Sequence, residues 1–157
     1  MKQILSILTT TLFLNCAMLV TPAEPAASSA DPMLKAVNDL RARGCRCGSA
    51  QMPPVPPLSW DDRLTTAAQR HAGDMARRDF FSHQGSDGST FSKRASDAGY
   101  RWRNIGENIA YNYPDAVTVV QGWQESPAHC KNMMSADFRQ MGAAVYGGYW
   151  VQVLGQE

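Results

Sequence analysis

The sequence lacks the clustered charge that polyanion-binding proteins need. Its 157 residues carry 15 lysines and arginines against 14 aspartates and glutamates, which leaves a formal net charge of +1. The basic residues are dispersed, without a block of about five or more like charges and without a basic stripe that alternates with stacking aromatics. Nucleic acid is therefore excluded as a predicted partner.

Established catalytic motifs are missing as well. Gly85-Ser86-Asp87-Gly88 fits neither the G-x-S-x-G nucleophile elbow nor the spacing of a phosphate-binding loop, and its composition predicts a turn. Cys45-Arg46-Cys47 lacks the second C-x-x-C or histidine pair of a structural zinc site. No internal repeat is visible. Any activity must therefore come from residues that the fold brings together.

The N-terminus has the pattern of an export signal. Met1 and Lys2 precede a mostly apolar run over residues 4–20, and small residues and prolines follow over residues 21–30. Threonines and Asn15 interrupt the run, which favours a signal peptide over a transmembrane helix. Residues 1–30 are therefore predicted to be a signal peptide and cleavage region, and the protein is predicted to be secreted or periplasmic. Cleavage after Ala23, Ala27 or Ala30 remains open.

The remaining residues, 31–157, fit one domain with a single hydrophobic core. We expect no stable membrane span in this mature chain. Its oligomeric state remains open, because an odd cysteine could pair between chains.

Three cysteines remain after the predicted cleavage: Cys45, Cys47 and Cys130. Export favours a disulfide, and strain argues against a bond between two cysteines only two positions apart. We expect a long-range bond to Cys130. Cys47–Cys130 is the working pair, and the sequence leaves Cys45 open as the alternative partner.

Apolar periodicity predicts alternating helices and strands. Met33, Val37 and Leu40, for example, recur at helical spacing. Helices are expected from Asp31 to about Leu40, from Ser59 to Arg78, from Ser89 or Thr90 to Gly99, from Pro114 to Trp123, and from Ser126–Pro127 onward. Strands are expected over Ile105–Tyr111 and as a hairpin within 141–154 that turns at Gly147–Gly148, and residues 44–57 are expected to form an irregular loop.

Three residues are candidates for a functional site. His83 ends a short apolar stretch before a turn, where it can face a cleft. Glu107 shares one face of its predicted strand with Ile105 and Ile109, and a carboxylate among aliphatic side chains needs a partner or a shifted pKa. His129 falls in the first turn of a helix, whose dipole favours a neutral ring. His71 lies on an apolar helical stripe and is predicted to be a core residue.

Six motifs occur in an order that resembles the CAP superfamily, the SCP-like domain of cysteine-rich secretory, antigen 5 and pathogenesis-related 1 proteins. They are Leu58-x-Trp60-Asp61, the helix Ala68–Met75 with His71, Phe81-Ser82-His83, Gly106-Glu107-Asn108-Ile109-Ala110, Trp123-x-x-Ser126-Pro127-x-His129 with Asn132, and Tyr149-Trp150-Val151-Gln152. The resemblance covers nearly all of residues 31–157.

The resemblance implies an α+β fold, an α-β-α sandwich with a central antiparallel sheet between helical layers. It also implies a cavity with two histidines and two acidic residues that can hold zinc or another divalent cation. His83, Glu107 and His129 match three of these four positions. Ser126 stands at the fourth, with Glu125 one step earlier, and we include both as candidate ligand-binding residues.

Two functions from different classes follow from this resemblance. The first is a secreted binding module whose cleft accepts a metal, or a lipid, sterol, peptide or cell-envelope component. The second is a zinc-dependent hydrolase that uses His83, Glu107 and His129 as candidate catalytic residues. A third, structural hypothesis is that the three side chains only hold sheet and helices together. Because no independent catalytic constellation is present, the sequence favours the binding module.

Overall fold

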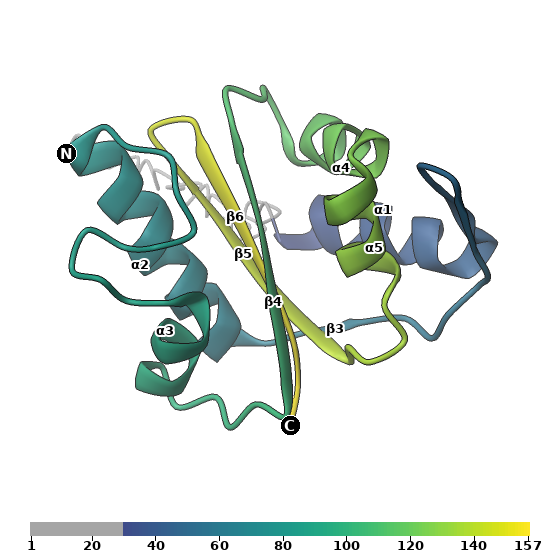
Figure 1. Cartoon of the computed structure of the whole chain (residues 1–157), viewed down its shortest axis with the longest axis horizontal. Helices are drawn as coiled ribbons and strands as arrows, with labels where there is room; N and C mark the ends of the chain where they lie inside the picture. Colours follow the sequence, from purple (N-terminus) through teal and green to yellow (C-terminus); the bar gives the residue numbers. More distant parts are fainter. Residues whose placement is uncertain (1–29) are drawn as a thin grey trace, which may run out of the picture.

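The computed structural model describes residues 30–157, so the predicted signal peptide lies outside the described residues except for its last position. The chain alternates helices and strands (Figure 1). The elements are α1 (Ala30–Arg43), β1 (Cys45–Cys47), β2 (Ala50–Met52), β3 (Ser59–Trp60), α2 (Asp62–Arg78), α3 (Phe91–Asp97), β4 (Asn104–Tyr111), α4 (Ala116–Glu125), α5 (Pro127–Met134), β5 (Gln140–Tyr146) and β6 (Tyr149–Gln156). No helix among the described residues is both long and apolar enough to cross a bilayer.

The central sheet has the strand order β3-β5-β6-β4. Strands β5 and β6 form the predicted hairpin, and Gly147 and Gly148 turn it with φ angles of 56° and 83°. Such positive φ values suit glycine because it has no Cβ. Strand β4 pairs antiparallel with β6 along its whole length and forms one edge of the sheet.

Two helical layers enclose this sheet. Helices α2 and α3 cover one face, and α1, α4 and α5 cover the other (Figure 1). The α+β class and the α-β-α sandwich are therefore confirmed. One detail differs from the expectation, because the short β3 pairs parallel with β5 and makes the sheet mixed.

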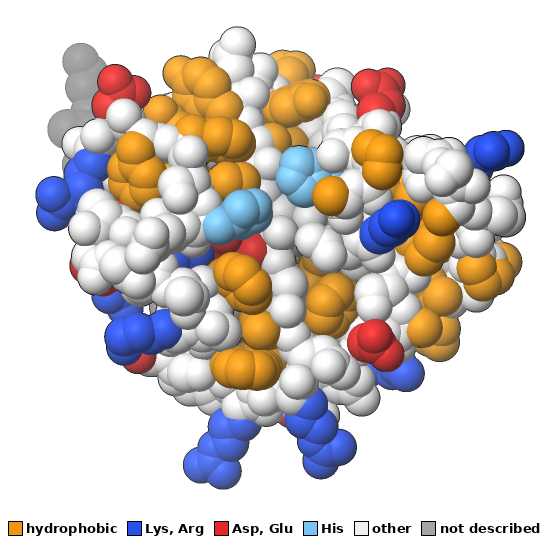
Figure 2. Space-filling view, in the orientation of Figure 1, with side chains coloured by type: hydrophobic (Ala, Val, Ile, Leu, Met, Phe, Trp, Pro, Cys, Tyr) orange, Lys and Arg blue, Asp and Glu red, His pale blue; other side chains and the backbone are white. Residues whose placement is uncertain are grey.

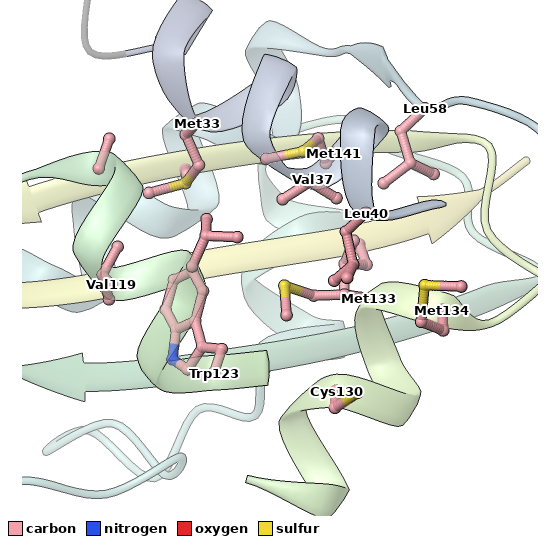
Figure 3. Packing of buried hydrophobic residues seen from close by; sticks show 14 of the residues in the cluster. Met33, Val37, Leu40, Leu58, Val119, Trp123, Cys130, Met133, Met134 and Met141 are labelled. Carbon is pink, nitrogen blue, oxygen red and sulfur yellow. The ribbon is translucent and has the colours of Figure 1, made fainter. Parts of the chain in front are cut away.

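Each face of the sheet has its own apolar core. Met33, Val37 and Leu40 of α1 are all buried, as their spacing predicted, and they pack with Trp123 of α4 beneath the sheet (Figure 3). The indole N–H of Trp123 also donates to the Ile109 carbonyl at 3.2 Å. Helix α4 is thereby fixed to strand β4 by both packing and a hydrogen bond.

Three expected boundaries were wrong for identifiable reasons. Helix α2 begins at Asp62, because the carboxylate of Asp61 caps it by accepting from the amides of Arg63 and Leu64, while Ser59 belongs to β3. Asp115 caps α4 in the same way, so that helix begins after Pro114. The predicted loop after α1 contains the hairpin β1–β2, which pairs over only three residues and has no clear period.

Gly142 on β5 provides a test of how closely α2 packs on the sheet. A Cβ at this position would lie 2.5 Å from the Leu64 carbonyl carbon and 2.8 Å from the Asp61 carbonyl oxygen, both of them backbone atoms. We predict that Gly142→Ala lowers the free energy of unfolding by about 1–3 kcal/mol, measured by urea denaturation, because overpacked backbone must shift.

Gly73→Ala in α2 is the matched control. The three atoms nearest its new Cβ, outside the helix backbone, all belong to the guanidinium of Arg77, an exposed and flexible side chain, and alanine favours a helix over glycine. This variant should be as stable as the wild type or more so. Equal losses in both variants would contradict the proposed packing.

Candidate functional site

The site begins with a contact between a loop and the edge strand. His83 lies in the loop between α2 and α3, and its Nδ1 is 2.8 Å from Oε1 of Glu107 on β4. The glutamate side chain is fully buried, whereas half of the histidine side chain is exposed. The carboxylate therefore holds the ring by Nδ1 and leaves Nε2, the other ring nitrogen, free of any hydrogen bond to the described residues.

Arg94 of α3 makes the buried carboxylate possible. Its guanidinium is 2.8 Å from Oε2 of Glu107, with only 2% of the arginine side chain exposed. The same guanidinium donates to the carbonyl oxygens of His83 and Ser89 at 3.0 and 2.9 Å. The predicted partner of Glu107 is thus an arginine, which also fixes the backbone of the loop that carries His83.

His71 lies behind this pair, in the core as predicted, with no exposed surface. Its Nε2 is 2.8 Å from the Ser82 carbonyl, so Nε2 carries the proton and Nδ1 is an acceptor. Burial lowers the pKa of His71, although the nearby Glu107 acts in the opposite direction. The ring of His71 is therefore neutral, and it holds the carbonyl of Ser82, the residue before His83.

A polar cavity of about 170 Å³ opens beside His71 and Arg94. Its walls also carry Arg70, Asp74 and Asp87. His71 Nδ1 and Arg94 Nε have no hydrogen-bond partner among the described residues.

Asn108 fixes the opposite side of the site. Its amide donates to Gln152 Oε1 at 2.9 Å and to the His129 carbonyl at 3.3 Å. Its own oxygen accepts from the amide of Asn132 at 2.9 Å, and that amide also reaches the Glu107 carbonyl. These bonds tie the first turn of α5 to β4 and so position His129.

His129 and His83 meet on one face of the molecule. Two histidine side chains lie next to each other there, above red acidic atoms and among orange apolar side chains (Figure 2); they are His83 and His129, because the third histidine of the chain is buried. Burial lowers the pKa of His129, and His83 lowers it further. Two imidazoles, of which His129 is biased toward its neutral form, therefore share this surface.

Glu107 differs from the ligand that the sequence suggested, because both of its oxygens are already bonded, one to His83 and one to Arg94. Its role as a direct metal ligand stays a prediction. Glu125 is exposed at the end of α4, and Ser126 occupies the N-cap of α5 without a side-chain capping bond. Within residues 30–157 neither side chain bonds to the two histidines.

The cysteines form a second cluster, on β1 and α5. A disulfide joins Cys47 to Cys130, with Cα atoms 5.5 Å apart, and Cys45 is free. In the described part of the chain, the sulfur atoms of these three cysteines all lie within 4.8 Å of one another, which is close enough for them to share one metal ion. Such a group could hold a metal ion after reduction of the disulfide.

Sequence reasoning missed Arg94 and Asn108. A signal for Arg94 was present, because it shares a helical face with Ala95 and Ala98, where a charged residue implies a buried partner. Asn108 follows Glu107 on a strand and must point to the opposite face. What it contacts there could not be read from the strand alone.

The fold and motifs identify the family. The model of the cysteine-rich secretory protein family, CAP, matches residues 34–154. This chain belongs to the CAP family, which confirms the resemblance.

The chain is similar to several known proteins, including the following three. YlbC of Bacillus subtilis (strain 168), an uncharacterized membrane protein, is 33% identical over 95 residues, which cover 60% of this chain and 28% of YlbC. An extracellular SCP-domain protein from Bacillus anthracis str. Ames has a TM-score of 0.67 and 28% identity, covering 81% of this chain and 41% of that one. An outer surface protein from Borrelia burgdorferi has a TM-score of 0.70 and 17% identity, covering 85% of this chain and 96% of that one, and this likeness concerns the fold. This chain therefore spans less than half of the first two proteins.

The Arg94–Glu107 pair can be tested by removing one partner. We predict that Arg94→Met lowers the free energy of unfolding by about 3–5 kcal/mol, because it leaves a buried carboxylate without its counter-ion. Chemical denaturation measures the loss. Adding Glu107→Gln should restore much of the stability, since the uncompensated charge is then gone.

Arg70→Met is the matched control. Arg70 is half exposed and pairs with Asp87 and Asp97 at the surface, so its loss should cost about 1 kcal/mol or less. Similar losses for the two arginines would show that burial does not set the strength of the Arg94 pair.

The neutral ring of His71 predicts a pH dependence. Its folded pKa is lowered by burial, so below about pH 6.5 the unfolded chain binds more protons than the folded one. Stability should therefore fall as the pH drops below this value. His71→Gln keeps a donor for Ser82 and should flatten this slope by up to about 1.4 kcal/mol per pH unit, measured by urea unfolding between about pH 7 and 5. Parallel curves for variant and wild type would contradict the assignment.

Proposed function

We propose that this CAP domain is an exported binding module whose functional surface is the pair His83–His129, able to hold a divalent cation such as zinc. The proposal rests on one observation: two imidazoles from opposite helical layers lie close together on one exposed face. Glu107 bonds the ring of His83, and Asn108 bonds the backbone carbonyl of His129.

The chemistry of His83 suits a metal ligand. Histidines that bind metals usually present one ring nitrogen to the ion and use the other to bond a carboxylate or carbonyl. His83 has this arrangement, with Nδ1 on Glu107 and Nε2 unbonded. His129 would supply the second nitrogen, and its lowered pKa keeps the ring available near neutral pH. Glu107 then acts by positioning His83, and a bound ligand or water would complete the coordination of the ion.

An aromatic surface lies beside this pair. Phe81, two positions before His83, is 55% exposed and packs against Tyr149, which in turn contacts the 54% exposed Tyr111. Exposed aromatic side chains that support one another are typical of binding surfaces. These aromatic residues favour a ligand that has an apolar portion and binds next to the cation, such as a lipid-like, sterol, peptide or cell-envelope compound.

The alternatives receive less support. A zinc hydrolase needs a base close to the metal, and the carboxylate of Glu107 is already paired with Arg94 and His83. The hypothesis of a purely structural network accounts for Glu107 and Arg94. It gives no role to the exposed face of His83 or to the adjacent aromatic residues.

Export is part of the proposal. It is supported by the leader pattern of residues 1–30, by the disulfide, and by the extracellular and outer-surface descriptions of two structurally similar proteins. Mass determination of the N-terminus of the protein recovered from the envelope or medium tests this part.

The metal site is tested with zinc itself. We predict that zinc raises the free energy of unfolding of the oxidised domain, by about 2.7 kcal/mol when free zinc is a hundredfold above its Kd. The double variant His83→Ala, His129→Ala should lose this stabilisation, because it removes both nitrogen ligands. Isothermal titration calorimetry gives the affinities directly.

Two further variants separate the possible sources of zinc binding. Cys45→Ser should leave the affinity unchanged, which excludes the cysteine cluster as the site. Glu107→Gln should weaken binding about 10–100-fold if the carboxylate only positions His83. Equal zinc binding by the wild type and the double histidine variant would refute the metal site, and a stability loss without any change in binding would favour the structural network.

A further inference from the structure

The third cysteine lies against the disulfide. The free Sγ of Cys45 is 3.6 Å from Sγ of Cys130 and 3.8 Å from Sγ of Cys47. Cys47 and Cys130 are buried, whereas Cys45 is partly exposed. A thiol and a disulfide are thus in van der Waals contact inside one small cluster.

The local backbone explains this arrangement. Cys45 and Cys47 are two positions apart on β1, so both side chains point to the same face of the strand, while Arg46 points away. That face packs on α5, where Cys130 lies in the buried part of the helix. Both cysteines of β1 therefore face the same partner, Cys130.

We propose that the cluster is a site of internal thiol–disulfide exchange, in which the Cys45–Cys130 and Cys47–Cys130 disulfides interconvert. The thiolate of Cys45 attacks Sγ of Cys130, the new S–S bond forms as the old one breaks, and Sγ of Cys47 leaves as a thiolate that takes up a proton. One thiol and one disulfide enter and leave the reaction, so no oxidant or reductant is consumed.

The contacts define what the step requires. Cys45 lies beside the S–S bond, nearly equidistant from its two sulfurs, so it must move before it can approach Cys130 in line with the bond. Cys45 lies on a strand of only three residues, and its side chain is partly exposed. In the product, Cys45 is bonded to Cys130 and Cys47 carries the free thiol.

The exchange would act close to the proposed binding surface. Cys130 directly follows His129 in α5, so the bond that ties this helix to β1 is one residue from the imidazole. The proposal itself rests on the sulfur contacts and does not require that metal binding be confirmed.

Tryptic mapping of the free thiol tests the exchange in the full domain. Burial raises the pKa of the Cys45 thiol above the ordinary value of about 8.5, so the oxidised protein is incubated at about pH 9.5, then acidified, unfolded and alkylated before digestion. Trypsin cuts after Arg43, Arg46 and Arg63, so Cys45 and Cys47 fall in different peptides. We expect the label to appear on Cys45 at first and to grow on Cys47 to a plateau, while Cys130 stays unlabelled.

Two single variants complete the experiment. Cys47→Ser should still form a disulfide, now between Cys45 and Cys130, and should carry no free thiol. Cys45→Ser retains the original bond and should remain unlabelled throughout, which controls for reduction by contaminants. Label that stays on Cys45 alone in the wild type at all times would overturn the proposal, whether or not the Cys47 variant folds.

Discussion

Two adjacent residues of β4 hold the site together because a strand alternates its side chains. Glu107 faces the layer of α2 and α3, where it bonds His83 and Arg94, and Asn108 faces the opposite layer, where it bonds the backbone of His129. Strand β4 lies at the edge of the sheet, so the two layers meet across it. The dipeptide thereby brings two histidines that are 46 positions apart in the sequence onto one surface.

The buried ion pair has a geometric role more than a stabilising one. Replacing a buried pair by apolar residues often costs no stability, whereas removing one partner is expensive. The Arg94–Glu107 pair is nevertheless connected to the proposed site, because the carboxylate fixes the ring of His83 and the guanidinium fixes the His83 carbonyl. The two charges thus lose their hydration on burial, and the network that they form holds the His83 imidazole in one orientation.

Helix α5 is anchored from two independent directions. On one side Asn108 and Asn132 bond it to β4, and on the other the disulfide of Cys130 bonds it to β1. The helix has only eight residues, too few to be stable alone, so these anchors replace intrinsic stability. His129 lies between them, which links the position of the proposed ligand to the covalent state of the cysteine cluster.

The sequence by itself determined the class of the fold, the periodic core residues such as Val37 and Trp123, the family, and a disulfide, because these depend on local spacing and on ordered motifs. It also selected His83, Glu107 and His129 as candidate site residues. Only the tertiary structure decided that Arg94 neutralises Glu107, that Asn108 positions α5, and that Cys47 is bonded while Cys45 lies beside the bond. Strand spacing alone shows that both cysteines lie on one face of β1. Which of them bonds Cys130 depends on how elements distant in the sequence pack together, and periodicity does not encode that packing.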